Sequence, residues 1–206
     1  MIDLLLATNN AGKIAELRNM LPDDVVVSSL RDLNLDAPEE TGASFAENSA
    51  SKAISAARSS GLLALGDDSG LEVGTLNGLP GIRSKRYAGE DASDRENIEL
   101  LLGQLAAVPA NQRSASFVCV LTLANSGGVL ASASGRCEGR IGTDRRGQNG
   151  FGYDPVFYLK DGRTIAELSL DEKDEVSHRS IALRSILPAV LIAVAAYRFH
   201  TQGVGQ

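Results

Sequence analysis

The chain has 206 residues, a formal net charge of −6 and 43% hydrophobic residues. This length and composition predict one folded domain over residues 1–206, in one or two lobes, and exclude a disordered chain. The acidic balance excludes general affinity for a nucleic-acid duplex but allows a small anionic substrate at a local basic site. Cys119 and Cys137 are expected to be buried, unpaired thiols of a reducing compartment.

The N-terminal segment predicts a strand, a polar loop and a helix. Residues 2–7 form a short apolar run typical of a buried strand, and apolar residues then recur at helical spacing until Pro22. The loop at 8–13, TNNAGK, lies between them. Backbone N–H groups at a helix start, together with one lysine, form an anion site. An ordinary strand–helix turn capped by Asn10 is the alternative.

Three helix starts carry the Ser-x-x-Glu pattern of a capping box. The pattern occurs at Ser44/Glu47, Ser93/Glu96 and Ser169/Glu172. The first predicts a helix over 45–60 that ends at Gly61, the second a helix reaching about residue 105, and the third a short helix. Asn48 and Lys52 share one face of the first helix, where a lysine is usually solvated.

Strands and helices alternate irregularly along the rest of the chain. Patterns of apolar and turn residues predict strands at 25–28, 114–124, 129–134 and 156–159, with a turn at 125–128 and a glycine-rich loop at 145–152. Residues 179–199 predict a helix with a break or kink near Pro188. This mixture predicts an α/β fold with a mixed sheet.

The longest apolar run, at 186–197, is short for a membrane span and contains Pro188. It could bury extra core or contribute to a dimer surface, and the sequence leaves both alternatives open. The N-terminus lacks the basic region of a signal peptide. The protein is therefore expected in the cytoplasm, with neither a membrane nor a nucleic-acid polymer as its partner.

Two adjacent carboxylates follow the apolar run at 62–65, in the segment GDDSG at 66–70. Like charges side by side resist burial, and a turn needs only one Asp and one Gly. Mg²⁺ takes a few carboxylate oxygens and is completed by waters and substrate phosphates. The segment is therefore interpreted as a candidate metal and proton-handling site, with a tight turn as the alternative. The acids of EETG at 39–42 are further candidate ligands, or simply favour the following helix dipole.

Two later segments offer side chains for a flat ligand. The loop at 147–155 places aromatic residues between glycines, which could bring a ring to the backbone; a packed turn with Phe151 buried is the alternative. Lys173, His178 and Arg179 supply hydrogen-bond donors, although a surface cap would explain the last two. Because the chain has only two histidines, a histidine metal cluster is excluded.

Six motifs, taken together, resemble one family. They are ATNNAGKIAEL at 7–17, EETGASFAENSASKA at 39–53, DDSGLEV at 67–73, LPGIRSKRYAGEDASD at 79–94, GFGYDPVF at 150–157 and AELSLDEKDEVSHRSIAL at 166–183. In this order, and over nearly the whole chain, they resemble the inosine/xanthosine triphosphate pyrophosphatase family. Gly66 stands where relatives more often carry a small side chain, and only local flexibility is expected to differ.

The resemblance implies both a fold and a reaction. The expected fold is an elongated, two-lobed α/β structure around a twisted mixed sheet flanked by helices, with the active site in a central cleft, assembled as a homodimer. The expected enzyme is a Mg²⁺-dependent nucleoside-triphosphate pyrophosphatase. It would hydrolyse ITP, dITP and XTP at the α–β phosphoanhydride bond to the monophosphate and pyrophosphate, which cleanses the nucleotide pool and prevents incorporation into DNA and RNA.

The resemblance also implies site residues. Asp68, Asp67 and Lys52 are the implied catalytic residues, and Glu40 and Asp68 are the implied Mg²⁺ ligands. Which aspartate accepts the proton stays open, because an Asp bound to the metal is not fully free as a base. The implied substrate-binding residues are Thr8, Asn9, Asn10, Ala11, Gly12, Lys13, Ser69, Phe151, Gly152, Tyr153, Asp154, Lys173, His178 and Arg179. Donors such as Lys173, His178 and Arg179 would suit the C6 keto group of the base and leave adenine poorly matched.

Three other functions are considered. A pyrophosphatase of the septum-formation-inhibitor type would have a similar fold, but the segments at 150–157 and 177–179 argue against it. A nucleotide sensor without turnover is disfavoured by the intact acids and lysines. A metal-dependent phosphatase would release inorganic phosphate, so product analysis distinguishes it.

Overall fold

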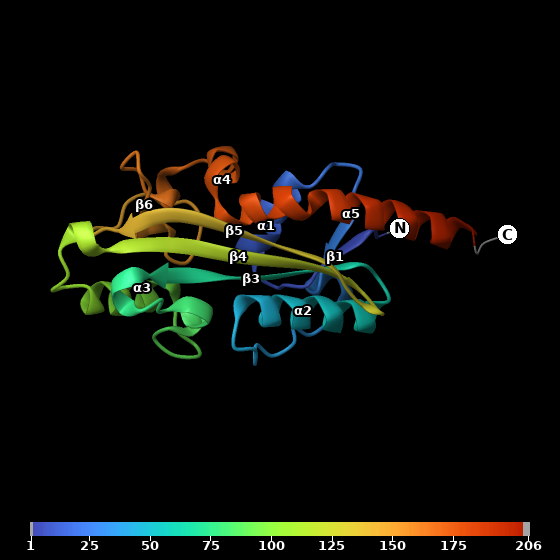
Figure 1. The fold of residues 1–206 in the computed structure, drawn as a ribbon, viewed down its shortest axis with the longest axis horizontal. Coiled ribbons are helices and arrows are strands. Elements are labelled where there is room, and N and C mark those ends of the chain that lie inside the picture. The colour runs from blue at the N-terminus through green and yellow to red at the C-terminus, as the bar shows by residue number, and fades with distance from the viewer. Residues whose placement is uncertain (1, 204–206) are drawn as a thin grey trace. The chain divides into compact units, whose positions relative to one another are not determined.

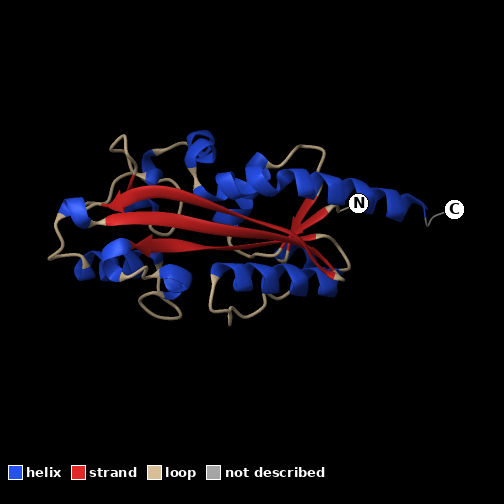
Figure 2. Ribbon diagram, viewed as in Figure 1, coloured by secondary structure: helices blue, strands red, loops and turns tan. Residues whose placement is uncertain are grey.

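The structure, a computed structural model, describes residues 2–203. Within these residues six strands pair in the order β2-β1-β3-β4-β5-β6 (Figures 1 and 2). The strands are β1 (Leu4–Leu6), β2 (Val27–Ser29), β3 (Ala64–Val73), β4 (Ser114–Asn125), β5 (Gly128–Ile141) and β6 (Phe157–Tyr158). Strand β1 runs parallel to β2 and β3, whereas β5 and β6 are antiparallel. The predicted α/β fold with a mixed sheet is confirmed.

Two strands are much longer than their local patterns predict. Strand β3 continues through the GDDSG segment, so these residues form no tight turn. Strand β5 extends to Ile141, seven residues past the predicted end at 134, because every second side chain is exposed and the apolar pattern fades. Exposed alternate residues are tolerated when the opposite face of the strand packs on a core.

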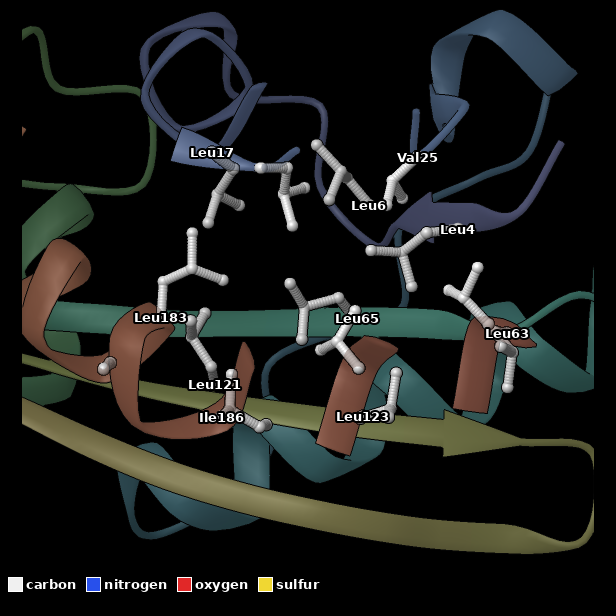
Figure 3. Packing of buried hydrophobic residues seen from close by; sticks show 14 of the residues in the cluster. Leu4, Leu6, Leu17, Val25, Leu63, Leu65, Leu121, Leu123, Leu183 and Ile186 are labelled. Carbon is white, nitrogen blue, oxygen red and sulfur yellow. The ribbon is translucent and has the colours of Figure 1, made fainter. Parts of the chain in front are cut away.

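The chain divides into two compact units, and the first contains residues 2–68, 119–135 and 179–203. Its helices are α1 (Ala11–Met20), α2 (Phe45–Ser60) and α5 (His178–Gly203). Helix α5 begins one residue before the last segment of this unit. Helices α1 and α5 pack on one face of the strands, and α2 packs on the other (Figure 1). Figure 3 shows the leucine-rich core under α1 and α5, in which Leu6, Leu65 and Leu121 point toward Leu17 and Leu183.

The second unit contains residues 69–118 and 136–178. Its helices are α3 (Asp94–Gln104) and α4 (Leu170–Val176). Its core joins Leu71 of β3 and Phe117 of β4 to Leu101 of α3 and to Phe157. Short 3₁₀ turns in the two units occupy Arg31–Leu33, Gly74–Leu76, Gly81–Arg86, Ala110–Gln112, Asp154–Val156 and Ile165–Glu167.

The predicted capping boxes form at two of the three helices. Ser93/Glu96 and Ser169/Glu172 each make both reciprocal hydrogen bonds. At α2 the hydroxyl of Ser44 accepts from the backbone N–H of Glu47, but the Glu47 carboxylate accepts from the N–H of Ala43 instead of Ser44. The cap is therefore one residue wider than predicted, and α2 ends at Gly61 in the left-handed region, as expected.

Helix α5 continues through Pro188 as a single helix, so of the two predicted alternatives, a break or a kink, the break is wrong. Pro188 is exposed. By length and composition alone, residues 178–200 could cross a membrane, contrary to the expectation from the apolar run, but only a third of that window is buried. One face of this helix packs Ile186, Val190 and Val194 into the core of the first unit. Core helices of globular proteins pass the same test of length and composition, so one such helix is weak evidence for a span.

Candidate active site

Asp67 and Asp68 lie in the middle of β3, where neighbouring side chains point to opposite faces of the sheet. Asp67 contacts residues of α1 and α5, whereas Asp68 contacts residues of α2. The strand therefore separates two like charges that the sequence places side by side. Asp67 has two cationic partners and Asp68 has one, and these charges offset part of the cost of burial.

Asp67 is fully buried between two cations. Its Oδ1 lies 2.6 Å from Nζ of Lys13, and its Oδ2 lies 2.7 Å from Nε of Arg179. Burial opposes ionisation of this carboxyl, but the charges of Arg179 and Lys13 prevail and hold its pKa well below the ordinary value. Asp67 is therefore ionised and has both oxygens engaged. The thiol of Cys119 lies 3.7 Å from Oδ2.

Arg179 joins Asp67 to a second buried acid. Its guanidinium also forms an ion pair with Glu16 of α1, and all three side chains are almost fully buried. Burial disfavours the charged arginine, but the two carboxylates raise its pKa above the ordinary value. An arginine fork suits two carboxylates because it presents several donors in a fixed plane. With Lys13, the last residue of the loop at 8–13, these side chains form a buried ionic array.

Asp68 lies in a different environment on the α2 side. Its Oδ1 is 2.7 Å from Nζ of Lys52, and its Oδ2 accepts a hydrogen bond of 3.2 Å from the amide of Asn48. Burial raises the pKa of Asp68 above the ordinary value, because it outweighs the opposing charge of Lys52. A carboxylate with a raised pKa is a better proton acceptor than its neighbour on the same strand.

Lys52 links Asp68 to the segment that precedes α2. Its Nζ lies 2.5 Å from Oε1 of Glu40, so two carboxylates converge on one cation. Burial alone would lower the pKa of Lys52, but Asp68 and Glu40 raise it. Asn48 fixes the same segment, since its side-chain oxygen accepts from the N–H of Gly42. The expectation that a lysine at this helical position is solvated is wrong here, because Lys52 is only 8% exposed.

The carboxylates of Glu40 and Asp68 fit the donor set of a hard divalent cation. Mg²⁺ takes one or two carboxylates and leaves its other positions to waters and substrate phosphates. Oε1 of Glu40 and Oδ1 of Asp68 both lie close to the positive charge of the Lys52 ammonium. Among the described residues no group of three or more His, Cys, Asp and Glu side chains is arranged to hold a metal by itself. The arrangement therefore matches a cation completed by substrate.

The loop at 8–13 forms the start of α1 next to Asp67. Asn10 caps the helix by accepting from the N–H of Lys13 at 3.0 Å, and its own N–H donates to the hydroxyl of Thr8 at 3.1 Å. The capping expected of Asn10 is confirmed. The remaining N–H groups of the first turn, with Lys13, provide the donors that an anion needs at a helix N-terminus. Lys13 is held in place by Asp67.

The second unit gathers a ring, an ammonium and a carboxylate. Nζ of Lys173 lies 2.6 Å from Oδ2 of Asp154 and 5.0 Å from the centre of the Phe151 ring. The same carboxylate oxygen accepts from the N–H of Phe151 at 3.0 Å. Glycines 150 and 152 both adopt positive φ, so the loop turns tightly around Asp154. Lys173 and Asp154 are both almost fully buried.

Two other residues of this segment are fixed by packing. Tyr153 is buried, and its hydroxyl donates to the carbonyl of Ser84 at 2.9 Å. Its phenol is therefore part of the core of the second unit. His178 is 7% exposed, and its ring stacks on Phe117 with 4.9 Å between ring centres. A surface cap, the alternative considered for His178, is wrong because the residue is buried.

The structure sorts the sequence-predicted residues between the two units. Residues 8–13, Glu40, Lys52, Asp67, Asp68 and Arg179 belong to the first unit, and Ser69, residues 151–154, Lys173 and His178 belong to the second. The side chain of Arg179 is committed to Asp67 and Glu16, an environment that the sequence did not indicate. Its predicted contact with a base stays a prediction.

Two residues of the first group were not assigned to the site from sequence. Glu16 forms an ion pair with Arg179. The sequence pattern that could have indicated this role is an acidic residue three positions after Lys13, on the same face of the helix. Asn48 forms hydrogen bonds with Asp68 and Gly42. The sequence pattern that could have indicated this role is its position four residues before Lys52, on the same face of the helix. Both sequence patterns are common on solvent-exposed helices. Only the packing of α1 and α2 therefore shows that Glu16 and Asn48 contact residues of the candidate site.

Gly66 allows α2 to lie close to β3. A Cβ atom at this position would come within 2.2 Å of the Ser49 carbonyl oxygen and 2.9 Å of the Ala53 nitrogen. The expectation that this glycine affects only local flexibility is therefore wrong. Close approach lets Asn48 and Lys52 reach Asp68 with side chains of their natural length.

Paired acids, lysines and a helix N-terminus on a mixed sheet are features with which proteins bind phosphate groups together with a divalent cation. The Ham1 family model matches residues 4–189. The chain belongs to the Ham1 family, and the resemblance drawn from its motifs is confirmed.

Several relatives and solved structures are similar over nearly the whole chain. The dITP/XTP pyrophosphatase of Mycolicibacterium paratuberculosis is 48% identical, covering 92% of this chain and 96% of the relative. That of Exiguobacterium sibiricum is 47% identical, covering 91% and 96%. The structure of a HAM1 protein from Coxiella burnetii has a TM-score of 0.83 at 41% identity and covers 93% of this chain and 99% of that chain.

Proposed function

We propose that this protein is a pyrophosphatase that hydrolyses non-standard purine nucleoside triphosphates, namely ITP, dITP and XTP, to the monophosphate and pyrophosphate. Cleansing the nucleotide pool in this way would keep these bases out of DNA and RNA. Relatives that carry the name dITP/XTP pyrophosphatase at 46–48% identity support the proposal. The observation that carries it is the convergence of Glu40 and Asp68 on one cation beside a lysine-bearing helix N-terminus.

The two aspartates would have different tasks in this reaction. Asp68 is the general base: it accepts a proton from the water that attacks the α-phosphorus, and pyrophosphate leaves with the electron pair of the broken P–O bond. Its raised pKa and its amide and ammonium neighbours support this role. Asp67 is ionised and bound by two cations, so it is poorly suited to take a proton. It is a positioning residue that holds Lys13 toward the start of α1.

Positive charge would neutralise the triphosphate. A triphosphate carries about four negative charges near neutral pH, and fixed cations stabilise the charge that develops on the leaving pyrophosphate. Lys13 and the N–H groups at the start of α1 would bind the phosphates, and Lys52 would orient Asp68 and face the reacting group. Glu40 and Asp68 would hold a divalent ion, proposed to be Mg²⁺, which polarises phosphate oxygens when bound.

Recognition of the base would use the second unit. Phe151 would stack on the purine, and the Lys173 ammonium beside it would donate to the C6 keto group. Asp154 holds that ammonium at 2.6 Å, which restricts its orientation. In ATP the C6 amino group of adenine would face the Lys173 ammonium. Because both groups are hydrogen-bond donors, neither would find an acceptor, and ATP would be disfavoured.

The proposal extends to the surroundings of the enzyme. The protein would be a homodimer in the cytoplasm, with a small-molecule substrate and neither a nucleic-acid polymer nor a membrane as partner. The net charge of −6 supports the exclusion of a nucleic-acid polymer. The packing of α5 into the core of the first unit supports a helix that serves folding instead of membrane insertion.

Product analysis would test the proposal. Purified protein would be incubated with Mg²⁺ and ITP, XTP, GTP or ATP, and pyrophosphate and phosphate would be scored separately. Pyrophosphate from ITP and XTP, with little turnover of the other two, is expected. Release of inorganic phosphate, or equal turnover of all four, would contradict the assigned reaction or the assigned base pocket.

A further inference from the structure

The start of helix α3 contacts both ends of the glycine-rich loop at 145–152, within the second unit. The carboxylate of Asp94, the first residue of α3, accepts a hydrogen bond of 2.6 Å from the backbone N–H of Gly152. At the other end of the loop, the guanidinium of Arg145 donates to the carbonyl of Arg95 at 3.1 Å. The loop is therefore attached to α3 through contacts that join residues distant in the sequence.

The Asp94 contact fixes the backbone next to the Phe151 ring. The N–H of Phe151 donates to Asp154, and the following N–H, that of Gly152, donates to Asp94. Gly152 has a φ of 58°, in the left-handed region that glycine adopts without strain. Because glycine also adopts many other conformations, this joint needs a partner to hold it in one of them. The two carboxylates together fix consecutive peptide groups on either side of the ring.

The start of α3 is a firm support for such a contact. Asn97 is buried, accepts from the N–H of Ala88 at 2.8 Å and donates to the carbonyl of Lys85 at 3.0 Å. Ile98 and Leu101 of the same helix lie in the core of the second unit. A hydrogen bond from the loop to this helix end therefore holds the loop against a packed part of the protein.

We propose that Asp94 is a positioning residue for recognition of the base. It holds the N–H of Gly152, so that the Phe151 ring stays beside the Lys173 ammonium before the substrate arrives. The inference rests on the proposed function, in which this ring stacks on the purine. A loop that must be ordered during binding lowers affinity, because its conformational entropy is lost at that step. Asp94 therefore acts on substrate affinity and leaves the chemical step unchanged.

Stabilisation of α3 itself is the alternative role for this acid. A carboxylate in the first turn of a helix interacts favourably with the helix dipole. Glu96 lies in the same turn, but its carboxylate accepts from the N–H and the hydroxyl of Ser93 and so caps α3. Changes at Asp94 and Glu96 therefore separate attachment of the loop from capping of the helix. Both side chains are exposed, so their replacement leaves the core of the second unit intact.

NMR of protein labelled with ¹⁵N-glycine tests the contact without substrate. Asp94→Ala is expected to speed exchange of the Gly152 amide proton with water by about five- to tenfold, because one hydrogen bond is lost. Asp94→Asn, which keeps an oxygen acceptor, and Glu96→Ala, which weakens only the cap of α3, are expected to leave the rate close to that of the wild type. Equal rates in wild type and Asp94→Ala, or equal acceleration in Glu96→Ala, would overturn the proposal.

Steady-state kinetics on ITP test the consequence for binding. Asp94→Ala is expected to raise KM by about three- to fivefold at nearly constant kcat. Asp94→Asn should recover most of this loss, and Glu96→Ala should leave KM unchanged. In a Phe151→Ala background, Asp94→Ala should raise KM by less than about twofold, because the ring that it positions is missing.

The kinetic outcomes distinguish this inference from the proposed function. An unchanged KM for Asp94→Ala in a protein that hydrolyses ITP would overturn the inference and leave the proposed function intact. The same holds for a fall in kcat at unchanged KM, and for full additivity with Phe151→Ala. Absence of ITP hydrolysis by the wild type would contradict the proposed function, and the role of Asp94 in base recognition would fall with it.

Discussion

The side chains around Asp67 and those around Phe151 are fixed by different physical means. The first group is an array of ion pairs, in which two lysines and one arginine hold four acids. The second relies on rings and tight backbone turns, with one ion pair between Lys173 and Asp154. Charged groups suit the handling of phosphate charge, and rings suit the recognition of a flat base. We therefore expect changes in the first group to affect turnover and stability, and changes in the second group to affect substrate binding.

Asp68→Asn should have the largest effect on turnover and little effect on the fold. The variant removes the proposed proton acceptor, so kcat is expected to fall by about 10²–10⁴. Lys52 keeps Glu40 as a partner, and burial already disfavours the ionised form of Asp68, so the loss of unfolding free energy should be smaller than that caused by Asp67→Asn. Steady-state kinetics and urea unfolding would measure the two quantities. Asp91→Asn, an exposed acid, is the matched control, and full turnover by Asp68→Asn would refute the assignment of the base.

Asp67→Asn should damage the fold more than any single change at an exposed ion pair. Loss of this charge leaves Arg179 and Lys13 without a shared partner in a buried site, which costs about 3–5 kcal/mol of unfolding free energy. Glu99→Gln, which breaks the exposed pair with Arg95, should cost about 0.5 kcal/mol or less. Urea unfolding of both variants would compare them. Equal losses would mean that the buried array contributes no more than a surface pair.

The lowered pKa of Asp67 predicts how this difference depends on pH. A carboxyl with a depressed pKa in the folded state stabilises the fold above its unfolded value of 3.8, and the stabilisation is lost as the pH falls through the folded value. The gap in unfolding free energy between wild type and Asp67→Asn should therefore be constant near neutral pH and shrink below about pH 4. A gap that is unchanged in acid would contradict the assigned ionisation.

Gly66→Ala tests how the ionic group is assembled. The added methyl group would meet the Ser49 carbonyl at 2.2 Å and push α2 away from β3, which should cost about 1–3 kcal/mol. Gly103→Ala in α3 is the matched control, because its Cβ would meet nothing within 4 Å and should stabilise the helix by about 0.5–1 kcal/mol. Thermal unfolding would measure both. Stabilisation of both variants would show that α2 adjusts without strain.

Phe151→Ala should have the smallest effect, and it should be confined to substrate binding. Loss of a stacking ring costs about 0.5–1.5 kcal/mol, so KM for ITP should rise by about three- to tenfold at nearly constant kcat. Phe151→Tyr keeps the ring and should leave KM nearly unchanged. Steady-state kinetics on ITP would measure the three proteins. A fall in kcat for Phe151→Ala at unchanged KM would place the ring in the chemical step instead.

The amino-acid sequence by itself determined the local elements and the family. Helix starts at Ser93 and Ser169 follow from capping chemistry that acts within four residues, and the six motifs identify the Ham1 family. The acids and lysines of the candidate site are also visible in the motifs. These features depend on residues that are close along the chain, so pattern and spacing are sufficient to find them.

The tertiary structure decided which charged side chains form ion pairs with each other. The sequence left open which of two adjacent aspartates handles the proton, because a carboxyl's pKa depends on burial and on partners distant in the chain. Strand β3 sends Asp67 to Lys13 and Arg179, the latter 112 residues away in sequence, and sends Asp68 to Asn48 and Lys52. The alternation of side chains along a strand, together with the packing of α1, α2 and α5, gives identical residues opposite electrostatic environments.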